Sequence, residues 1–282
     1  MYINSDMEIF DGETAQDRLL KSVYSNAFLR LLIKPLTLPA VSKAAGRFLD
    51  SRLSYHLIKP FIKANKIDMT DYEPKRYVSF NDFFTRRIRA GRRIIDKNAR
   101  IISPCDGKVS AYKIDSSSVF EIKHSLYSIY SLTRSKVLSE KFKGGTAVVI
   151  RLCVDDYHRY CYPISGIKST NVAIPGFLHT VNPAALAKEK VFVENSREYC
   201  LIKNSDVCLV QIEVGALMVG RISNNEMFTA SVVKGDEKGC FEFGGSTIVL
   251  LLDSKTDVRS EFLENTELGL ETLIKQGEAI SY

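Results

Sequence analysis

The chain has 282 residues, of which 45% are hydrophobic and 26% are charged, and it carries a formal net charge of +6. These values are those of a soluble globular protein with one large domain or two small ones. The sequence contains no run of about 18 uncharged apolar residues and no basic segment leading into an apolar one near the N-terminus, so we expect neither a membrane-spanning helix nor a signal peptide. The six cysteines form no Cys-x-x-Cys pair, which predicts reduced thiols in a cytosol.

The positive charge is concentrated near the N-terminus. Ten Lys and Arg residues lie between Arg18 and Lys66 against one acid, Asp50. The 17 residues before Arg18 carry five acids and no base. This asymmetry predicts an anionic partner, either a membrane surface or nucleic acid, although a solvated helix face would give the same pattern.

The first third of the chain has helical periodicity. Thr14 and Asp17 form a capping box, and apolar residues at helical spacing follow until Pro35 ends the helix. A second helix is predicted after Pro39, and a third apolar segment, 57–62, is expected to be broken by Pro60. These segments are amphipathic and basic, so their apolar faces could lie in a core or in a lipid interface.

Farther along, Ser79 and Asp82 predict a second capping box and a short helix that carries Phe83 and Phe84. From Ile101 the period changes to two. A helical turn is predicted around 182–188, and the predicted strands are Lys108–Ile114, Ala147–Cys153, Gly166–Ala173, Val207–Val214, Ala216–Ile222, Phe228–Val233 and Thr247–Leu252.

The fold class that follows is α+β. A helical N-terminal region, 1–75, precedes a mostly antiparallel, glycine-rich core of β-sandwich or barrel-like form, 76–282. The boundary between the two regions is approximate and lies near residue 75. The first region would be the membrane-associating part, and the second the catalytic core.

Three short stretches contain residues that could carry chemistry. In "SPCDGKV", Asp106 precedes a strand, where Asp-Gly is also ordinary turn chemistry. In "CVDDYHRYCYP", His158 lies among carboxylates and tyrosines, a setting that suits a general acid or base as well as a surface loop. In "FEFGGSTIVLLLD", two glycines and Ser246 interrupt a strand, which by itself most often marks a turn or bulge.

The functional interpretation of the glycine-serine stretch is a self-cutting site. If a base removes the Ser246 proton, the serine oxygen can attack the carbonyl of Gly245, which converts the amide to an ester. Elimination then cuts the chain and leaves the serine carbon skeleton as a pyruvoyl group. That ketone can form a Schiff base with an amine.

These motifs together resemble the phosphatidylserine decarboxylase family over nearly the whole chain. The resemblance depends on six stretches in this order: "SFNDFFTRRI", "SPCDGKV", "DYHRY", "LHTVNP", "EVGALMVGRI" and "KGDEKGCFEFGGSTIV". It implies a proenzyme that cuts itself between Gly245 and Ser246. The products would be a large chain, 1–245, and a small chain of 37 residues headed by the pyruvoyl group, which stay together. The relay proposed for such a cut maps to Asp106, a histidine and Ser246.

The resemblance also implies the reaction and its setting. Phosphatidylserine would condense with the covalent pyruvoyl cofactor, lose CO₂ with His158 as the general acid, and leave as phosphatidylethanolamine. No metal is expected, because His56, His124, His158 and His179 lack ligand spacing. The enzyme would lie on the cytoplasmic side of the cell membrane, on anionic lipid that contains its substrate, and would bind no nucleic acid. Self-association into a homo-oligomer stays open.

One position departs from the family pattern. Many members carry Tyr-His-Arg-x-His, whereas this chain has Cys161 in place of the second histidine. Either His158 serves both the cut and the decarboxylation, or Cys161 substitutes in part. A thiol is mostly protonated at neutral pH, so we predict that Asp106 acts through His158.

Three rival functions remain at this stage. The first is an uncut relative that binds lipid in the membrane without activity, which the joint presence of Asp106, His158 and Ser246 argues against. The second is a metallohydrolase on a similar β sandwich, which would require paired histidine ligands. The third is a nucleic-acid binder, for which no recognition motif is present.

Overall fold

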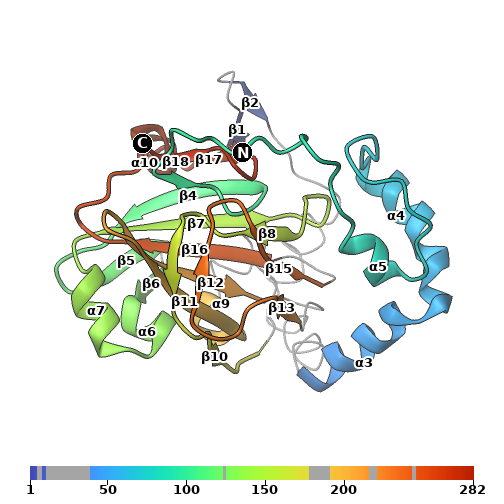
Figure 1. Ribbon diagram of the computed structural model, residues 1–282, viewed down its shortest axis with the longest axis horizontal. Helices are drawn as coiled ribbons and strands as arrows, with labels where there is room; N and C mark the ends of the chain where they lie inside the picture. The colour runs from blue at the N-terminus through green and yellow to red at the C-terminus, as the bar shows by residue number, and fades with distance from the viewer. Residues whose placement is uncertain (5–7, 11–38, 123–124, 178–190, 216–220, 243–245) are drawn as a thin grey trace.

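The centre of the molecule is a large, mostly antiparallel sheet, in which β1 alone of the described strands pairs in parallel, with β17. In the computed structural model the described residues are 1–4, 8–10, 39–122, 125–177, 191–215, 221–242 and 246–282 (Figure 1). Eleven strands of this part form the sheet, in the order β14-β9-β11-β12-β16-β7-β4-β17-β1-β2, with β10 also paired to β11. Their bounds are β1 Tyr2–Ile3, β2 Ile9–Phe10, β4 Gly107–Lys113, β7 Thr146–Leu152, β9 Gly166–Lys168, β10 Val172–Ile174, β11 Arg197–Lys203, β12 Cys208–Val214, β14 Ala230–Val232, β16 Ser246–Leu252 and β17 Glu271–Ile274.

Smaller elements cover both faces of this sheet. A three-stranded sheet, β13 Ile222–Asn224, β15 Glu237–Phe241 and β8 Arg159–Cys161, packs on one face together with α10, Ser260–Glu267. The other face is covered by the hairpin β5 Val119–Ile122 and β6 Ser125–Ser128 and by the helices α6 Ile129–Thr133, α7 Lys136–Phe142 and α9 Val191–Glu194. A short pair, β3 Ile101–Ile102 with β18 Ala279–Ser281, completes the described strands. This arrangement confirms the predicted α+β class with a sandwich-like core, and the described sheet does not close into a barrel.

The N-terminal helices gather at one side of the molecule (Figure 1). They are α3 Pro39–Asp50, the 3₁₀ helix η2 Arg52–Leu57, α4 Ile58–Asn65 and α5 Phe80–Phe84. Leu49, Ile58 and three phenylalanines of α5 form their shared apolar cluster. Among the described residues, no helix combines the length and apolar character needed to cross a bilayer.

Pro60 does not break the third apolar segment, so that expectation is wrong. Pro60 is the third residue of α4. The first N–H groups of a helix have no partner within the helix, so a proline in the first turn removes no hydrogen bond. The predicted cap of α5 is half confirmed. The Ser79 hydroxyl accepts from the Asp82 amide at 3.2 Å, but the Asp82 carboxylate binds the Val78 amide at 3.0 Å.

Most predicted strands are present, and one is divided. β4, β7, β12 and β16 match their predictions to within one residue at each end. The predicted strand Gly166–Ala173 forms β9 and β10, because Lys168 lies opposite Ile202 whereas Val172 lies opposite Tyr199. The four-residue advance from Lys168 to Val172 is therefore paired with a three-residue advance from Ile202 to Tyr199 on β11. One extra residue on one strand is the geometry of a bulge. The predicted strand Phe228–Val233 is shortened to β14, and β13 begins at the last residue of the predicted strand Ala216–Ile222.

Several predictions lie outside the described residues. These are the Thr14–Asp17 capping box with its helix, the helical turn at 182–188, residues 216–220 of one strand, and the Gly244-Gly245 pair. The boundary near residue 75 stays a prediction.

Candidate active site

The structure brings Ser246 and His158 together in the interior. Ser246 is the first residue of β16, between β12 and β7, and His158 directly precedes β8 of the small sheet. The distance from Ser246 Oγ to His158 Nδ1 is 3.3 Å, and both side chains are fully buried. The Phe241 amide donates to the His158 carbonyl at 2.9 Å, which fixes the backbone of residue 158 against β15.

The turn before His158 determines which ring nitrogen carries the proton. His158 Nε2 lies 2.9 Å from the carbonyl oxygen of Cys153, a group that can only accept. Nε2 therefore carries the hydrogen, and a neutral imidazole leaves Nδ1 as an acceptor for the Ser246 hydroxyl. The turn itself is held by Asp156, whose amide donates to the Cys153 carbonyl at 3.0 Å and whose carboxylate accepts from the Cys153 amide at 2.6 Å.

The helix α5 covers the imidazole. The ring of Phe84 lies 4.2 Å from the ring of His158, centroid to centroid, at an interplanar angle of 33°. Burial and the nearby Arg86 guanidinium lower the pKa of His158 to about 3. His158 is therefore neutral at pH 7, as a group that accepts a proton from a serine must be. Burial, with Asp155 nearby, raises the pKa of Asp156 to about 6.

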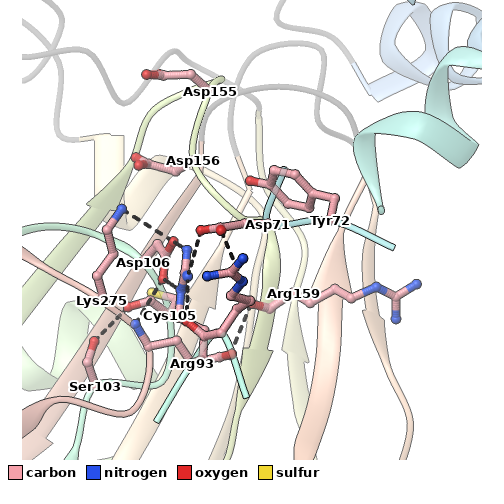
Figure 2. Close-up of polar contacts among 12 residues, drawn as sticks. Asp71, Tyr72, Arg93, Ser103, Cys105, Asp106, Asp155, Asp156, Arg159 and Lys275 are labelled. Carbon is pink, nitrogen blue, oxygen red and sulfur yellow. Dashed lines mark hydrogen bonds and ion pairs between the residues drawn. The ribbon is translucent and has the colours of Figure 1, made fainter. Parts of the chain in front are cut away.

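Asp106 is buried, and its side-chain contacts lead to arginine and lysine (Figure 2). Its oxygens accept two hydrogen bonds from Arg93, at 2.8 and 2.5 Å, and one from the Gln276 amide at 2.9 Å. The Lys275 ammonium lies 3.6 Å away. The structure thus brings Ser246 to His158, but among the described residues it places no hydrogen bond between Asp106 and His158. The predicted relay from Asp106 stays a prediction.

Cys161 faces away from Ser246. It packs against Ala99, Ile102 and Ala279, and its thiol lies 3.9 Å from the Ser103 carbonyl. Side chains alternate along a strand, so positions 158 and 161 of this extended segment point to opposite faces. Burial also raises the pKa of the Cys161 thiol well above its ordinary value. Both facts favour His158 as the base that serves Ser246.

A cavity of about 240 Å³ lies on the side of this segment toward which Cys161 points, and Tyr157, Arg159 and Cys161 are among its lining residues. Arg87, Arg89 and Arg93 also line it. Arg159 pairs with Glu237 at 2.7 Å, and so does Arg87 at 3.1 Å. Neither His158 nor Ser246 is among the residues that line this cavity.

Four contributors to the site were not predicted as site residues: Phe84, Arg86, Cys153 and Asp156. Phe84 and Arg86 belong to "SFNDFFTRRI", and Asp156 to "DYHRY", so the motifs mark the right stretches. The backbone carbonyl of Cys153 has no signal in a sequence. Within the described ranges, no cluster of three or more His, Cys, Asp or Glu could hold a metal ion. Gly245, the other half of the predicted cut site, lies outside the described residues.

Comparison with known proteins gives the family. A family model described as phosphatidylserine decarboxylase matches residues 80–281. Phosphatidylserine decarboxylase proenzyme 2 of Clostridium acetobutylicum is 42% identical, over 98% of this chain and 96% of that protein. The phosphatidylserine decarboxylase proenzyme of Clostridium botulinum is 37% identical over 99% and 98%, and that of Clostridium perfringens is 39% identical over 92% and 90%.

Proposed function

The chain belongs to the phosphatidylserine decarboxylase family, and on that premise we propose that it converts phosphatidylserine to phosphatidylethanolamine with a pyruvoyl group made from Ser246. The observation that carries the proposal is the buried contact of 3.3 Å between Ser246 Oγ and His158 Nδ1. A serine hydroxyl aimed at a neutral imidazole is the arrangement of an activated nucleophile. It lies at the residue where the family resemblance places the cut.

The residues fit the formation of such a group. Ser246 Oγ gives its proton to His158 Nδ1, and the oxygen attacks the carbonyl carbon of Gly245. The peptide C–N bond breaks as the ester forms, and the proton passes to the departing nitrogen. Removal of the Ser246 α-proton then forms a Cα–Cβ double bond and expels the Gly245 carboxylate. The remaining enamine takes up water and releases ammonia, which leaves a ketone at residue 246.

That ketone, once formed, supplies a carbonyl that condenses with the substrate amine and accepts the electrons released as CO₂ leaves. The chain's own contribution is the handling of one proton in a closed site. His158 Nδ1 faces residue 246 and holds the proton that returns to the carbon from which CO₂ has left. A low pKa makes a protonated His158 a strong acid for that transfer. Phe84 excludes water from the imidazole and maintains its orientation.

The N-terminal helices support a membrane surface as the place of reaction. A groove of about 450 Å³ between α3, η2, α4 and α5 is lined wholly by apolar residues, among them Phe48, Leu57 and Phe61. Leu53, on η2, is 73% exposed. Exposed Arg52, Lys59 and Lys63 lie on the same helices. Apolar side chains and exposed cations on the same helices match the interface of an anionic bilayer, and we propose peripheral attachment there, on the cytoplasmic side.

The experiment is intact mass spectrometry together with an assay of CO₂ release from phosphatidylserine in mixed micelles. We expect two fragments, one of about 4 kDa in proportion to the 37 of 282 residues and the 31.7 kDa chain. The small fragment should react with hydroxylamine, and the Ser246→Ala chain should stay whole and inactive. An active chain that remains whole would contradict the pyruvoyl mechanism. A whole, inactive chain that binds vesicles would favour the lipid-binding alternative.

A further inference from the structure

Arg86 is a buried guanidinium whose partners are all neutral. It is 2% exposed. Nη2 lies 3.2 Å from Tyr72 Oη, 3.2 Å from the Asp155 carbonyl and 3.4 Å from the Asp156 carbonyl, and Nη1 lies 3.5 Å from the Phe84 carbonyl. None of the ion pairs in the described part of the chain includes Arg86, and its Nε has no partner there. A buried charge without a counter-ion is costly to folding, so its presence at this position calls for a reason.

Arg86 contacts the two groups that lie against the His158 imidazole, namely Phe84 and the turn that begins at Cys153. On one side, Arg86 binds the carbonyl of Phe84, whose ring lies 4.2 Å from the imidazole. On the other side, it binds the carbonyls of the turn in which Asp156 fixes Cys153. The Cys153 carbonyl in turn accepts from His158 Nε2. One side chain therefore ties together the two groups that orient the imidazole.

We propose that Arg86 is the positioning residue for His158. The guanidinium holds the ring and the turn that orient the imidazole, and its charge keeps Nδ1 free of a proton so that Nδ1 can accept the Ser246 hydroxyl proton. The consequence for catalysis rests on the proposed function. The state of the imidazole can be measured independently of that function.

The charges around His158 support this role. Burial and then the charge of Arg86 lower the pKa of His158, and the hydrogen bond to the Cys153 carbonyl acts in the opposite direction. The turn before His158 carries the carboxyls of Asp155 and Asp156 and the thiol of Cys153, and the hydroxyls of Tyr72 and Tyr157 lie beside it. The packed elements α5, β8 and β15 also carry charged or titratable side chains, among them Asp82, Arg159, Glu237, Lys238 and Cys240. Without Arg86, the lowering that its positive charge adds to that of burial would be lost. The pKa of His158 should then rise.

The first test uses the Ser246→Ala chain, which we expect to be uncut and uniform. Labelling histidine with ¹⁵N gives four imidazoles to assign, since the chain has four histidines. We expect His158 to stay neutral, with its proton on Nε2, down to about pH 4. Adding Arg86→Gln, which is neutral but keeps a donor for the turn, should raise the midpoint by about 1 to 3 pH units, toward pH 5. Arg86→Lys keeps a charge and should leave His158 neutral over the same range.

The second test follows cutting in chains that retain Ser246. At a midpoint near pH 5 half of His158 is protonated, so the Arg86→Gln chain should be cut about twofold more slowly at pH 5 than at pH 7. Arg86→Lys should slow cutting by the same factor at both pH values, because an ammonium replaces only part of the fork of donors. Arg87→Met is the matched control: this neighbouring arginine is 56% exposed and pairs with Glu237, and its loss should change neither readout.

Two outcomes would overturn the proposal. One is a folded Arg86→Gln chain in which His158 titrates as in its parent, which would reduce Arg86 to a structural cross-link. The other is an Arg86→Lys chain that is cut at the rate of its parent. This second outcome applies also if the Arg86→Gln chain does not fold. If instead the unmodified chain releases no CO₂ from phosphatidylserine while His158 of the Ser246→Ala chain stays neutral as expected, the proposed function fails and the role of Arg86 stands.

Discussion

The hydroxyl oxygen of Ser246 lies 3.3 Å from Nδ1 of His158, although 88 positions separate the two residues in the chain. The contact forms because β16 of the large sheet and β8 of the small sheet begin at the same place in the interior. The Phe241 amide, on β15, binds the His158 carbonyl and fixes this register. Because both side chains are fully buried, no water competes for the hydrogen bond, which strengthens it.

This geometry predicts different effects for two substitutions near the site. His158→Ala removes the acceptor of the Ser246 proton, so most of the chain should stay whole. Cys161→Ala changes a residue on the opposite face and should be cut at close to the normal rate. The measurement is the rate at which the small fragment appears in cell-free synthesis. If Cys161→Ala stalls while His158→Ala is cut normally but cannot decarboxylate, the two steps use different residues and the single-histidine hypothesis is wrong.

Local patterns were sufficient for the central strands and for α5. The apolar run from Ile248 to Leu252 predicts β16 because a central strand is buried on both faces, as all seven of its residues are. The Ser79 cap predicts the start of α5 because the hydrogen bond is made within three residues. The family motifs named Ser246 and His158 as site residues, and the structure brings their side chains together in the interior.

Tertiary contacts determined the rest. β11 was not predicted, because it begins with Arg197, a residue type that is rarely buried. In the fold this guanidinium is 2% exposed and binds backbone carbonyls such as those of Leu132 and Val193. Arg86 was not predicted as a site residue for the same reason, since arginine is rarely buried. The role of the Cys153 carbonyl depends on the turn from Cys153 to Asp156, which no residue pattern in the sequence predicts.

The low pKa of His158 predicts acid sensitivity of the uncut protein. The folded pKa of about 3 lies below the ordinary value of about 6.5, so the unfolded chain binds more protons between these pH values. Stability should therefore fall as the pH drops below about 6.5, by up to about 1.4 kcal/mol per pH unit for this one group. Denaturant titrations of the Ser246→Ala chain from pH 7 to 4 measure it.

His158→Gln in the same background should remove that component of the pH dependence. Asp156 acts in the opposite direction: its raised pKa of about 6 adds stability that is lost as the pH rises from its ordinary value toward 6. Asp156→Asn should therefore steepen the acid loss. Equal slopes in the parent and the His158→Gln chain would show that His158 is not buried in the neutral form.

The membrane proposal predicts a charge effect that depends on place. Lys59→Glu with Lys63→Glu reverses two exposed charges on α4, beside the apolar groove. At about 1 kcal/mol for each basic residue near an anionic surface, binding to phosphatidylserine vesicles should weaken by more than tenfold at low salt. Lys136→Glu with Lys141→Glu makes the same change on α7, on the opposite side of the view (Figure 1), and should have little effect. Equal losses in both pairs would indicate a response to net charge rather than a docking face.

Asp106 provides the last prediction. Arg93 and Asp106 form a pair with 13% and 2% side-chain exposure, so Asp106→Asn leaves a mostly buried guanidinium without its counter-ion. Breaking a buried pair from one side costs about 3–5 kcal/mol, and we expect a loss toward the lower end because Arg93 also lies 3.8 Å from Asp71. Arg93→Met leaves the carboxylate with the Gln276 amide and Lys275, and should destabilise the chain by a similar amount.

Comparing the two variants separates support of the fold from a relay. If Asp106 acts only by tying residue 93 to residues 275–276, both variants should slow the cut in proportion to their loss of stability, measured by denaturant titration in the Ser246→Ala background. If Asp106 acts through His158, as the family resemblance implies, Asp106→Asn should slow the cut far more than Arg93→Met at equal stability. The contacts of Asp106 in this structure favour the first result, because every side-chain hydrogen bond it makes in the described part of the chain leads to Arg93 or Gln276.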